Sequence, residues 1–496
     1  MLLRIRRLAS TRHSTTGRTH LTGTWLLLSL LGSLHSIVGC TAEPTPPSHV
    51  SAGPNIVLIL VDTLRADHLR AYGYERETSP NIDTLARSGV RFARTRSQAS
   101  WTKPSMASIW TAIHPSGTGV MRFSHGLPEV AEMPAERLRA EGYLTAGIWR
   151  NGWVSPGFGF AQGFDLYLRP PPTRLISRRA IGGMRPPAPV ATDMDATEST
   201  REFLRTFRDR RFFLYVHFMD VHQYVYDESS TLFGTGYADA YDNAVHWVDM
   251  NVGLILEELD RLDLRESTLV VVAADHGEEF RDHGGEGHGK TLYDEVTHVP
   301  LVFSQPGHLP STVVVEDPVQ NVDIWPTIFD LIGLLPIDGA QGRSLRPLIW
   351  RGEQDDQANA APPRTTFSQI DRIWGRRNAE PRPLVSVAHG GYRLIHPLTP
   401  PGSDELYDLR SDPSEHHDLS ASHPDVVREL TLRIDRHLAR RPAWPTVREV
   451  ELDDMGLHQL RALGYLGVGQ GDQPASNATE HVPVEPRLEE ESSSAP

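Results

Sequence analysis

Two apolar runs, more than two hundred residues apart, dominate the hydrophobic pattern of the chain. They lie at residues 55–61 and 268–274 and are rich in Val, Ile, Leu and Ala. Continuous runs of this length are typical of strands buried on both faces of a parallel sheet. Asp62 follows the first run at once, and Asp275 and His276 follow the second. Because ligands of open α/β sheets bind just outside the carboxyl ends of the strands, the pattern predicts a site there.

Amphipathic segments around these two runs predict helices that alternate with strands. Helices are expected at residues 80–85, 134–141 and 241–262, and further buried strands at 143–149 and 212–218. Proline at position 80 and glycine at position 142 are typical of a helix start and a helix end. Because such alternation is typical of βαβ units, residues 54–350 are predicted to form an α/β domain with a mostly parallel sheet flanked by helices.

The pattern changes after about residue 350. Residues 384–396 predict a β-hairpin that turns at the Gly-Gly pair 390–391, and residues 426–438 predict a helix. A last helix is expected at 453–466. The following segment, 467–496, is rich in Gly, Ser, Pro and Glu, which predicts a disordered acidic tail.

The first forty residues have the composition of an export signal. Five arginines and no acidic residue precede an apolar stretch at 24–39. That stretch is shorter than the roughly 20 apolar residues that a membrane-spanning helix needs. The Pro-rich segment 41–53 is expected to be a tether.

Cys40 is the only cysteine of the chain, and it directly follows Ile37-Val38-Gly39. This pattern resembles a bacterial lipobox, in which the cysteine is lipidated and becomes the mature first residue. The alternative is a cysteine that merely lies near an ordinary signal cleavage site. We therefore predict a lipoprotein signal over 1–40, lipidation at Cys40 and a lipid-anchored protein exported to the bacterial cell envelope. A single cysteine also excludes an intrachain disulfide.

Chain length and net charge limit which kinds of protein this chain can be. A chain of 496 residues with 39% hydrophobic content can build a large core plus a smaller piece. The formal net charge is −14, whereas nucleic-acid binding requires a basic surface. The composition therefore argues against a nucleic-acid partner.

The strand-end residues have the chemistry of a metal site. Asp62 and Asp275 offer hard oxygen ligands and His276 offers an imidazole, a combination that suits a divalent cation. The alternative is that each aspartate only caps a helix or begins a turn. The coincidence of both aspartates with a neighbouring histidine favours a metal.

Sequence pieces spread over residues 54–440 resemble, in the same order, those of the sulfatase family in the alkaline-phosphatase superfamily. The matching pieces are Pro54–His68, Ser79–Ala86, Pro104–Ser108, Gly142–Ala146, Phe212–His217, Asp275–Glu279, Gly287–Lys290, Leu292–Glu295, Val299–Leu301 and Glu405–Leu409. The resemblance implies an alkaline-phosphatase-like fold, with a small antiparallel C-terminal subdomain over 351–466. It also implies a metal-dependent hydrolase of sulfate or phosphate esters.

The chain departs from the family at the nucleophile. Family members carry Cys, or sometimes Ser, in a Cys-x-Pro-x-Arg motif, and this residue is converted to formylglycine. The aligned positions here begin with Thr102 and end with Met106, so neither formylglycine nor the motif's arginine is available. We expect Thr102 to act as the nucleophile and as a metal ligand, because metal coordination activates an otherwise weak hydroxyl. Phosphorus esters are therefore favoured over sulfate esters.

A second departure from the family pattern bears on which metal ion the site binds. Thr63 replaces the second aspartate of the family's usual Asp-Asp pair. One carboxylate fewer makes the site less negative, which favours a single Mn²⁺ or Zn²⁺ ion, with Ca²⁺ possible.

The resemblance also implies roles for four further residues. Lys290 and His288 lie in a glycine-rich loop. Lys290 aligns with the lysine that contacts the sulfate or phosphate oxygens, and His288 is expected to bind the same group or to act in proton transfer. His222 aligns with the active-site histidine that binds substrate or protonates the leaving group. Lys103 is expected to replace part of the missing arginine's charge. His283 is left open between a second-site ligand and a structural residue.

Two strand-end residues carry weaker expectations. Asn151 stands where many relatives have a Lys-x-His motif, so it is predicted only as a substrate contact. His217 is expected to be a buried structural histidine.

Three functions compete on this basis. The first is the ester hydrolase, acting on a sulfated or phosphorylated small molecule, glycan or lipid. The second is an envelope phosphoryl-group transferase, although such relatives usually carry several membrane helices that this hydropathy pattern does not predict. The third is a catalytically weak binding lipoprotein, which purification without any bound metal would favour.

Overall fold

The computed structural model describes residues 53–172, 191–351, 363–371, 380–400 and 402–451. The predicted signal at 1–40, nearly all of the tether, the helix at 453–466 and the acidic tail lie outside the described residues. Among the residues that are described, no helix is both long enough and apolar enough to cross a membrane.

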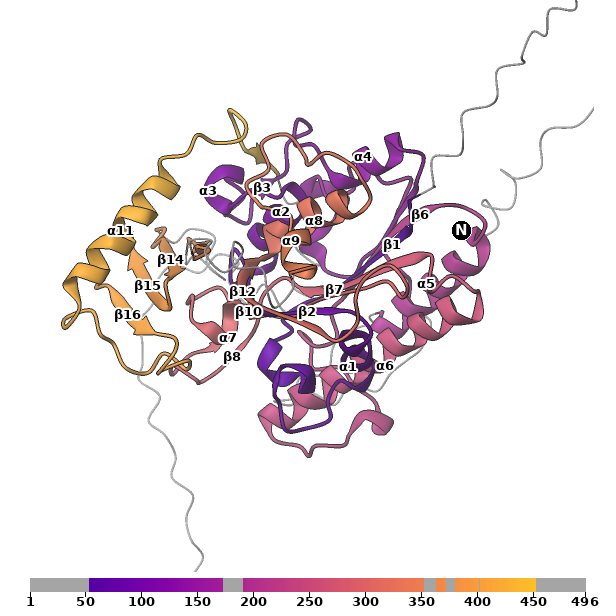
Figure 1. Ribbon diagram of the computed structural model, residues 1–496, viewed down its shortest axis with the longest axis horizontal. Coiled ribbons are helices and arrows are strands. Elements are labelled where there is room, and N and C mark those ends of the chain that lie inside the picture. The colour runs from indigo at the N-terminus through magenta and orange to yellow at the C-terminus, as the bar shows by residue number, and fades with distance from the viewer. Residues whose placement is uncertain (1–52, 173–190, 352–362, 372–379, 401, 452–496) are drawn as a thin grey trace, which may run out of the picture. The chain divides into compact units, whose positions relative to one another are not determined.

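Nine strands of the described residues form a central sheet (Figure 1). The order is β10-β2-β11-β7-β1-β6-β4-β5, with β12 also paired to β2. The strands are β1 (Asn55–Val61), β2 (Val90–Arg96), β4 (Leu144–Ile148), β5 (Leu166–Leu168), β6 (Phe212–Phe218), β7 (Thr268–Ala274), β10 (His298–Val299), β11 (Leu301–Ser304) and β12 (Val313–Gln320). The run from β7 to β5 is parallel throughout, and only the pairs made by β10 and β11 are antiparallel. The predicted mostly parallel sheet is confirmed.

Helices cover both faces of this sheet, which explains the unbroken apolar strands. In β1, Ile56 packs into the core on one face and Val57 into the core on the other. Figure 1 shows α1, α5 and α6 on one side of the strands and α2, α4 and α8 on the other. These helices are α1 (Pro80–Arg87), α2 (Thr102–Thr111), α4 (Pro134–Ala140), α5 (Asp193–Phe207), α6 (Tyr237–Arg261) and α8 (Ile324–Leu331).

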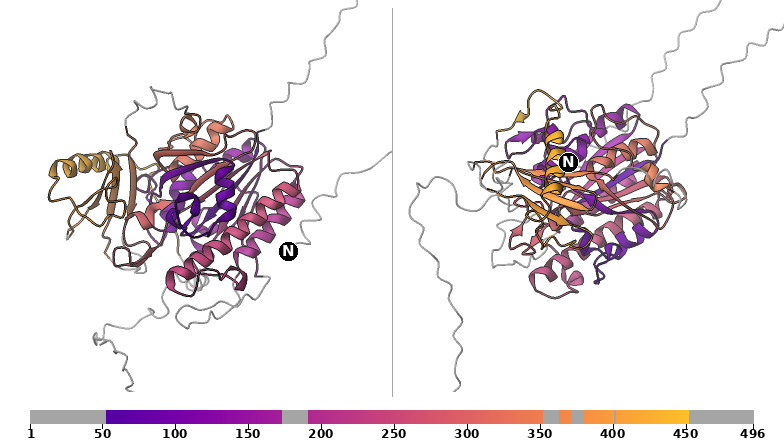
Figure 2. Two further views of the ribbon diagram at one scale, coloured as in Figure 1. Left: turned by 60° about the horizontal axis from the view of Figure 1, so that its bottom comes forward. Right: turned by 60° about the vertical axis from the view of Figure 1, so that its left-hand side comes forward.

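A smaller antiparallel sheet follows in the chain and packs against one helix (Figure 2). It consists of β13 (Thr366–Ile370), β14 (Leu384–His389), β15 (Tyr392–Pro397) and β16 (Glu405–Asp408), and the helix is α11 (Pro424–Leu438). The predicted hairpin is confirmed as β14 and β15. Gly390 and Gly391, at its turn, have φ angles of 61° and 88°, a left-handed conformation that favours glycine.

The remaining short elements connect these layers. Strand β3 (His125–Gly126) pairs with β17 (Arg448–Glu449), and β8 (Glu279–Phe280) pairs with β9 (Glu286–Gly287). The short helices are α3 (Pro115–Thr118), α7 (Asp294–Thr297) and α9 (Arg346–Ile349).

Two predicted helices begin earlier than expected, for a capping reason. Helix α6 starts at Tyr237 rather than Tyr241, because the Asp239 carboxylate accepts a hydrogen bond from the Gly236 N–H at 3.0 Å and closes the first turn. Helix α11 starts at Pro424 rather than at residue 426, since proline is favourable in the first turn. Apolar periodicity does not mark such polar first turns.

A buried ion cluster ties the small sheet to the segment that follows β7. Arg393 of β15 is 1% exposed and lies 3.0 Å from Glu415 Oε1 and 3.3 Å from Asp294 Oδ1. It also donates to Thr297 Oγ1 at 2.7 Å. The small sheet therefore holds residues 294–297, and through them the glycine-rich loop of residues 283–290.

Candidate active site

The predicted residues meet at the carboxyl edge of four adjacent parallel strands. Asp275 and His276 follow β7, Asp62 follows β1, His222 comes after β6 and Asn151 comes after β4. These strands are neighbours in the sheet, so their ends bring together residues that are far apart in the sequence.

Asp62, Asp275 and His276 form a compact group of metal-type ligands. One donor atom of each lies within 4.8 Å of the others, and all three side chains are fully buried. Thr102 Oγ1 is 3.4 Å from His276 Nε2, so the predicted nucleophile borders the same group.

The electrostatics of this group fit a cation. Burial, followed by the charge of Asp62, raises the pKa of Asp275 well above its usual range. Burial would also raise the pKa of Asp62, but neighbouring imidazoles, led by His217, lower it instead. Asp62 Oδ1 and Asp275 Oδ2 are buried and accept no hydrogen bond from any residue that the structure describes. Two buried, incompletely paired carboxylate oxygens are what a divalent cation would neutralise.

Strained backbone lies beside the same carboxylates. Thr63 has a φ angle of 59°, which is unfavourable for a β-branched residue, and its N–H donates to Asp275 Oδ1 at 3.3 Å. Its side-chain hydroxyl donates to the Asp62 carbonyl oxygen at 2.7 Å. Thr63, which stands in place of an aspartate, thus links the two strand ends by hydrogen bonds.

Thr102 is the first residue of helix α2 and is 1% exposed. Three residues on, Ser105 donates its hydroxyl to the Asp275 carbonyl oxygen at 2.6 Å and so fixes the start of the helix against the end of β7. The N–H groups of a first helical turn favour an anion, so Thr102 stands where a negatively charged ester could bind.

Asn151 contacts Thr102 rather than lying apart from it. Its Nδ2 donates to Thr102 Oγ1 at 3.2 Å and also to the Asp62 carboxylate. Its Oδ1 accepts from the Trp153 N–H at 2.8 Å, which fixes the orientation of the amide. The residue predicted as a substrate contact therefore also positions Thr102 against Asp62.

His217 has a second contact beyond its expected structural one. Its Nδ1 hydrogen-bonds with the Tyr215 hydroxyl at 2.7 Å, as a buried histidine should, but its Nε2 lies 3.3 Å from Asp62 Oδ2. Only the register of β6 against β1 brings the two together. The sequence alone contains no signal that distinguishes this histidine from one in the core.

Three histidines lie side by side next to the metal-type group. The His288 ring centroid is 4.6 Å from that of His276 and 5.0 Å from that of His222. Burial lowers the pKa of His276 to about 3 and that of His288 to about 4. Their neutral imidazoles offer lone pairs to a cation or one N–H to an ester oxygen.

Glu278 belongs to the site but is not among the predicted residues. It is 4% exposed, its Oε1 is 3.2 Å from His288 Nδ1, and burial raises its pKa to about 7. Its position two residues after His276, in a run of two glutamates, is the one signal that could have indicated it.

The two predicted lysines have different surroundings. Lys290 is exposed and donates to the Glu286 carbonyl oxygen at 2.6 Å, which leaves it at the mouth of the glycine-rich loop. Lys103 is fully buried and does not take the position expected of a substrate contact. Its ammonium group donates to backbone carbonyl oxygens, among them that of His125 at 3.0 Å, and lies 3.6 Å from the Phe158 ring centroid. The helix turns this side chain away from Thr102, so Lys103 does not replace the missing arginine.

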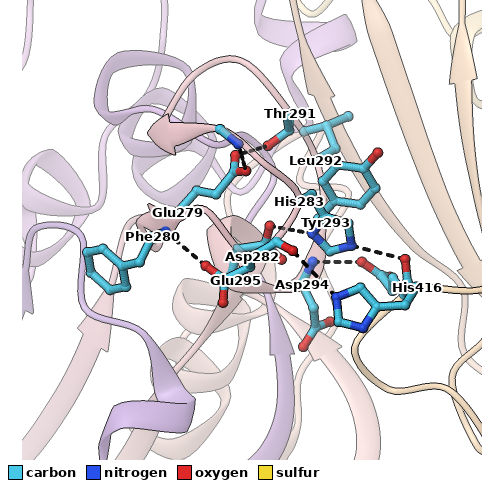
Figure 3. A network of polar contacts seen from close by, with 12 residues as sticks. Glu279, Phe280, Asp282, His283, Thr291, Leu292, Tyr293, Asp294, Glu295 and His416 are labelled. Carbon is cyan, nitrogen blue, oxygen red and sulfur yellow. Dashed lines mark hydrogen bonds and ion pairs between the residues drawn. The ribbon is translucent and has the colours of Figure 1, made fainter. Parts of the chain in front are cut away.

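His283, left open by the sequence, has structural partners on both ring nitrogens. Its Nδ1 is 2.8 Å from Glu295 Oε1, and its Nε2 is 3.0 Å from the carbonyl oxygen of Glu415. Figure 3 shows the ring stacked on Tyr293, at a centroid distance of 3.7 Å, with His416 nearby. His283 therefore joins the glycine-rich loop to the segment beside the small sheet.

From the ion pair between His283 and Glu295, we predict that the folded protein loses stability at alkaline pH. Burial opposes the charge of His283, but the hydrogen bond and charge of Glu295, with those of Glu415, raise its pKa to about 9. A folded-state pKa above the unfolded value of about 6.5 stabilises the protein fully below pH 6.5, and that stabilisation is lost as the pH rises through 9.

We expect denaturant unfolding to show a loss of about 1–2 kcal/mol between pH 7 and pH 10, after allowing for solvent screening. The variant His283→Gln should lose correspondingly less over the same interval. Equal pH dependence in the two proteins would contradict the assignment, because the acidic partners and Tyr293 are unchanged in the variant.

Comparison with known proteins agrees with this architecture. Residues 54–334 match the protein family described as Sulfatase, and residues 288–440 match the family described as N-sulphoglucosamine sulphohydrolase, C-terminal. The chain is 26% identical to the steryl-sulfatase of Rattus norvegicus, over 84% of this chain and 92% of that protein. It is 26% identical to arylsulfatase A of Homo sapiens, over 88% of this chain and 95% of that protein.

Solved structures share the fold at lower identity. A 2-O GAG sulfatase superposes with a TM-score of 0.65 at 21% identity, covering 78% of this chain and 92% of that chain. The phosphonate monoester hydrolase of Agrobacterium radiobacter superposes with a TM-score of 0.63 at 21% identity, covering 81% of this chain and 99% of that chain.

Proposed function

Since this chain belongs to the sulfatase family of ester hydrolases, we propose that it is a metal-dependent hydrolase that uses Thr102 and prefers phosphorus esters to sulfate esters. The observation that carries the proposal is the position of Thr102. Its hydroxyl oxygen lies at the start of α2, 3.4 Å from His276 Nε2 and 3.2 Å from Asn151 Nδ2. A threonine cannot become formylglycine, so the hydroxyl itself is left as the nucleophile.

Two side chains near Thr102 also differ from those of a formylglycine enzyme. Met106, at the position of the family's arginine, is buried in the apolar core. Lys103 is held by backbone carbonyl oxygens. The arrangement thus departs from that of the formylglycine enzymes in two groups besides the nucleophile.

Asp62, Asp275, His276 and Thr102 would hold the metal, with Mn²⁺ or Zn²⁺ favoured by this donor set. A bound divalent cation would lower the pKa of the Thr102 hydroxyl and offset negative charge on the ester. Asn151 orients Thr102 Oγ1, and His217 orients the Asp62 carboxylate. The chain's own residues therefore prepare the nucleophile before any substrate arrives.

In the reaction we propose, Thr102 Oγ1 forms a bond to phosphorus as the bond from phosphorus to the leaving alcohol breaks. His222, which burial keeps neutral, takes up the proton released by the Thr102 hydroxyl and gives it to the departing alcohol oxygen. His288 and Lys290 donate hydrogen bonds to the remaining phosphoryl oxygens. Water then attacks phosphorus and gives a proton to His222, the bond from phosphorus to Oγ1 breaks, and Oγ1 recovers the proton from His222, which regenerates Thr102 and releases the phosphorus acid.

The substrate class is an anionic ester of a glycan, a lipid or a small molecule. Relatives in the fold were solved with k-i-k-neocarrahexaose and with D-glucosamine-2-N,6-O-disulfate. We propose by analogy a sugar-borne anionic ester for this chain. Export through residues 1–40 and a lipid anchor at Cys40 belong to the same proposal and rest on the sequence pattern.

The test is a matched substrate panel. The chain beginning at residue 41 is assayed on aryl phosphate monoester, phosphodiester, phosphonate ester and sulfate ester, with Mn²⁺, Zn²⁺ or Ca²⁺ added in turn. We expect Thr102-dependent turnover of a phosphorus ester with kcat/KM at least tenfold above that of the sulfate ester. A preference for the sulfate ester would overturn the phosphorus part of the proposal, and metal-independent turnover would overturn the metal part.

A further inference from the structure

A basic cavity lies among residues from the main sheet region and the small antiparallel sheet. Its volume is about 430 Å³, within the range of small-ligand pockets. Asp323 is the one carboxylate among its lining residues, against five arginines: Arg343, Arg364, Arg433, Arg436 and Arg440. The chain has a formal net charge of −14, so this local cluster of positive charge is unusual for it.

Neighbouring carboxylates neutralise only part of the positive charge of these five arginines. The Asp323 carboxylate is taken up by Arg364 at 2.6 Å and by the backbone N–H of Arg343 at 2.7 Å. Arg433 pairs with Glu429 at 3.0 Å. The guanidinium groups of Arg343, Arg436 and Arg440 make no ion pair with any residue in the described part of the chain. Three positive charges around one cavity repel one another, and an anion would relieve that repulsion.

Two buried imidazoles in the wall also lack full hydrogen bonding. His114 and His437 are 3% and 2% exposed, and their rings meet edge to face at 4.7 Å. His437 Nε2 is 3.3 Å from Ser116 Oγ. The Nδ1 atoms of both histidines are buried without a hydrogen-bond partner among the described residues. Buried polar atoms are usually satisfied, so incomplete hydrogen bonding in two histidines that line one cavity favours a ligand there.

These imidazoles are suited to donate rather than to carry charge. Burial, with the charge of Arg440 acting in the same direction, lowers the pKa of His437 to about 4. Burial, together with the charges of His437 and Arg440, also lowers the pKa of His114 well below its usual range. Each neutral ring has one N–H to offer to an oxyanion, and the Phe367 ring is stacked on His437 at 4.0 Å and holds it in place.

The cavity is separate from the candidate active site. Thr102 is at the first residue of α2, whereas His114 lies just past its last residue, Thr111. A helix of this length spans about 15 Å, so the two sites lie at opposite ends of it. A ligand in the basic cavity is therefore not the ester group that reacts at Thr102.

We propose that this cavity is a binding site for a compact polyanion that carries two or more phosphate or sulfate groups. Guanidinium groups present a planar pair of donors that matches the oxygens of such groups. The arginines without an ion-pair partner come from two segments of the chain. Arg343 lies before α9, and Arg436 and Arg440 lie in or after α11, which suits a ligand with anionic groups at more than one point. The inference does not depend on the reaction proposed for Thr102.

The test measures binding of defined anions to the chain by calorimetry. The probes are inorganic sulfate, inorganic phosphate, pyrophosphate, a disulfated disaccharide and the neutral parent sugar. The variant Arg436→Gln/Arg440→Gln removes two charges from the cavity, and Arg343→Gln removes one that comes from a different segment of the chain. The control Arg428→Gln/Arg441→Gln removes two exposed charges near the same helix that do not line the cavity.

We expect pyrophosphate or the disulfated disaccharide to bind at least tenfold more weakly to the cavity double variant and severalfold more weakly to Arg343→Gln. The control double variant should bind within twofold of the unaltered protein. Whichever probe binds more tightly identifies phosphate or sulfate as the recognised group. Turnover of a small aryl ester should stay within twofold in all three variants, so loss of binding is distinguishable from failure of the proposed reaction.

Two results would overturn the proposal. One is equal affinity of the polyanionic probes for the unaltered protein and the cavity double variant. The other is binding of inorganic sulfate or phosphate as tight as that of the probes with two anionic groups, which would reduce the cavity to a site for a single ion.

Discussion

Replacing Thr102 by alanine is expected to lower kcat/KM for the preferred ester by about 10⁴-fold or more, because the variant has no nucleophile at the start of α2. The side chain is 1% exposed, and its hydroxyl is within hydrogen-bonding distance of His276 Nε2 and Asn151 Nδ2. Its loss therefore removes the proposed nucleophile and one of the proposed metal ligands together. Steady-state kinetics on the aryl ester panel measures the effect, with circular dichroism to verify the fold.

Two companion variants separate chemistry from packing. Thr111→Ala makes the same substitution in the last turn of α2, where the hydroxyl only donates to the Ala107 carbonyl oxygen at 2.7 Å. It should retain activity within a fewfold. Thr102→Ser keeps a hydroxyl and should retain measurable turnover. If Thr102→Ala kept even a tenth of the activity, Thr102 would not be the nucleophile.

Replacing Asp275 by asparagine is expected to abolish stoichiometric metal binding and to lower activity by about 10³-fold or more. The physical reason is the repulsion between two buried carboxylates. Burial and the charge of Asp62 raise the pKa of Asp275, so a cation is the natural counter-charge for the pair. The asparagine variant removes one carboxylate and, with it, most of the attraction for a divalent ion.

Stability measurements with and without metal make this prediction sharper. In the unaltered protein, metal at 100 times its dissociation constant should stabilise the fold by about 2.7 kcal/mol, and a chelator should reverse this. In Asp275→Asn the stabilisation should vanish. In the presence of chelator the variant should be at least as stable as the unaltered protein, since the carboxylate repulsion is gone.

A matched control is Asp249→Asn, which removes another buried carboxylate, one that accepts hydrogen bonds from Asn81 and from the Ile82 N–H. It should bind metal with unchanged stoichiometry. Unchanged metal content in Asp275→Asn, measured by elemental analysis after dialysis, would show that the Asp62 group is not the metal site.

The sequence by itself determined the parts of this protein that follow from local pattern and a topological rule. Unbroken apolar runs must be strands covered on both faces, and Asp62, Asp275 and His276 follow two such runs directly. Parallel strands end at one edge, so these residues had to meet there. The position of Thr102 followed from the family motif in which it lies. The helix starts were less accurate, because capping side chains rather than apolar periodicity set them.

Only the tertiary structure decided where each side chain points and what it meets. Thr102 and Lys103 are adjacent in the sequence, yet the helix directs them differently. Thr102 points to His276 at a strand end, whereas Lys103 points to backbone carbonyl oxygens. His217 meets Asp62 only through the register of two strands. The basic cavity joins His114 to arginines some two to three hundred residues later in the chain. Such contacts depend on distances between segments that no local pattern encodes, so they emerge only from the packed fold.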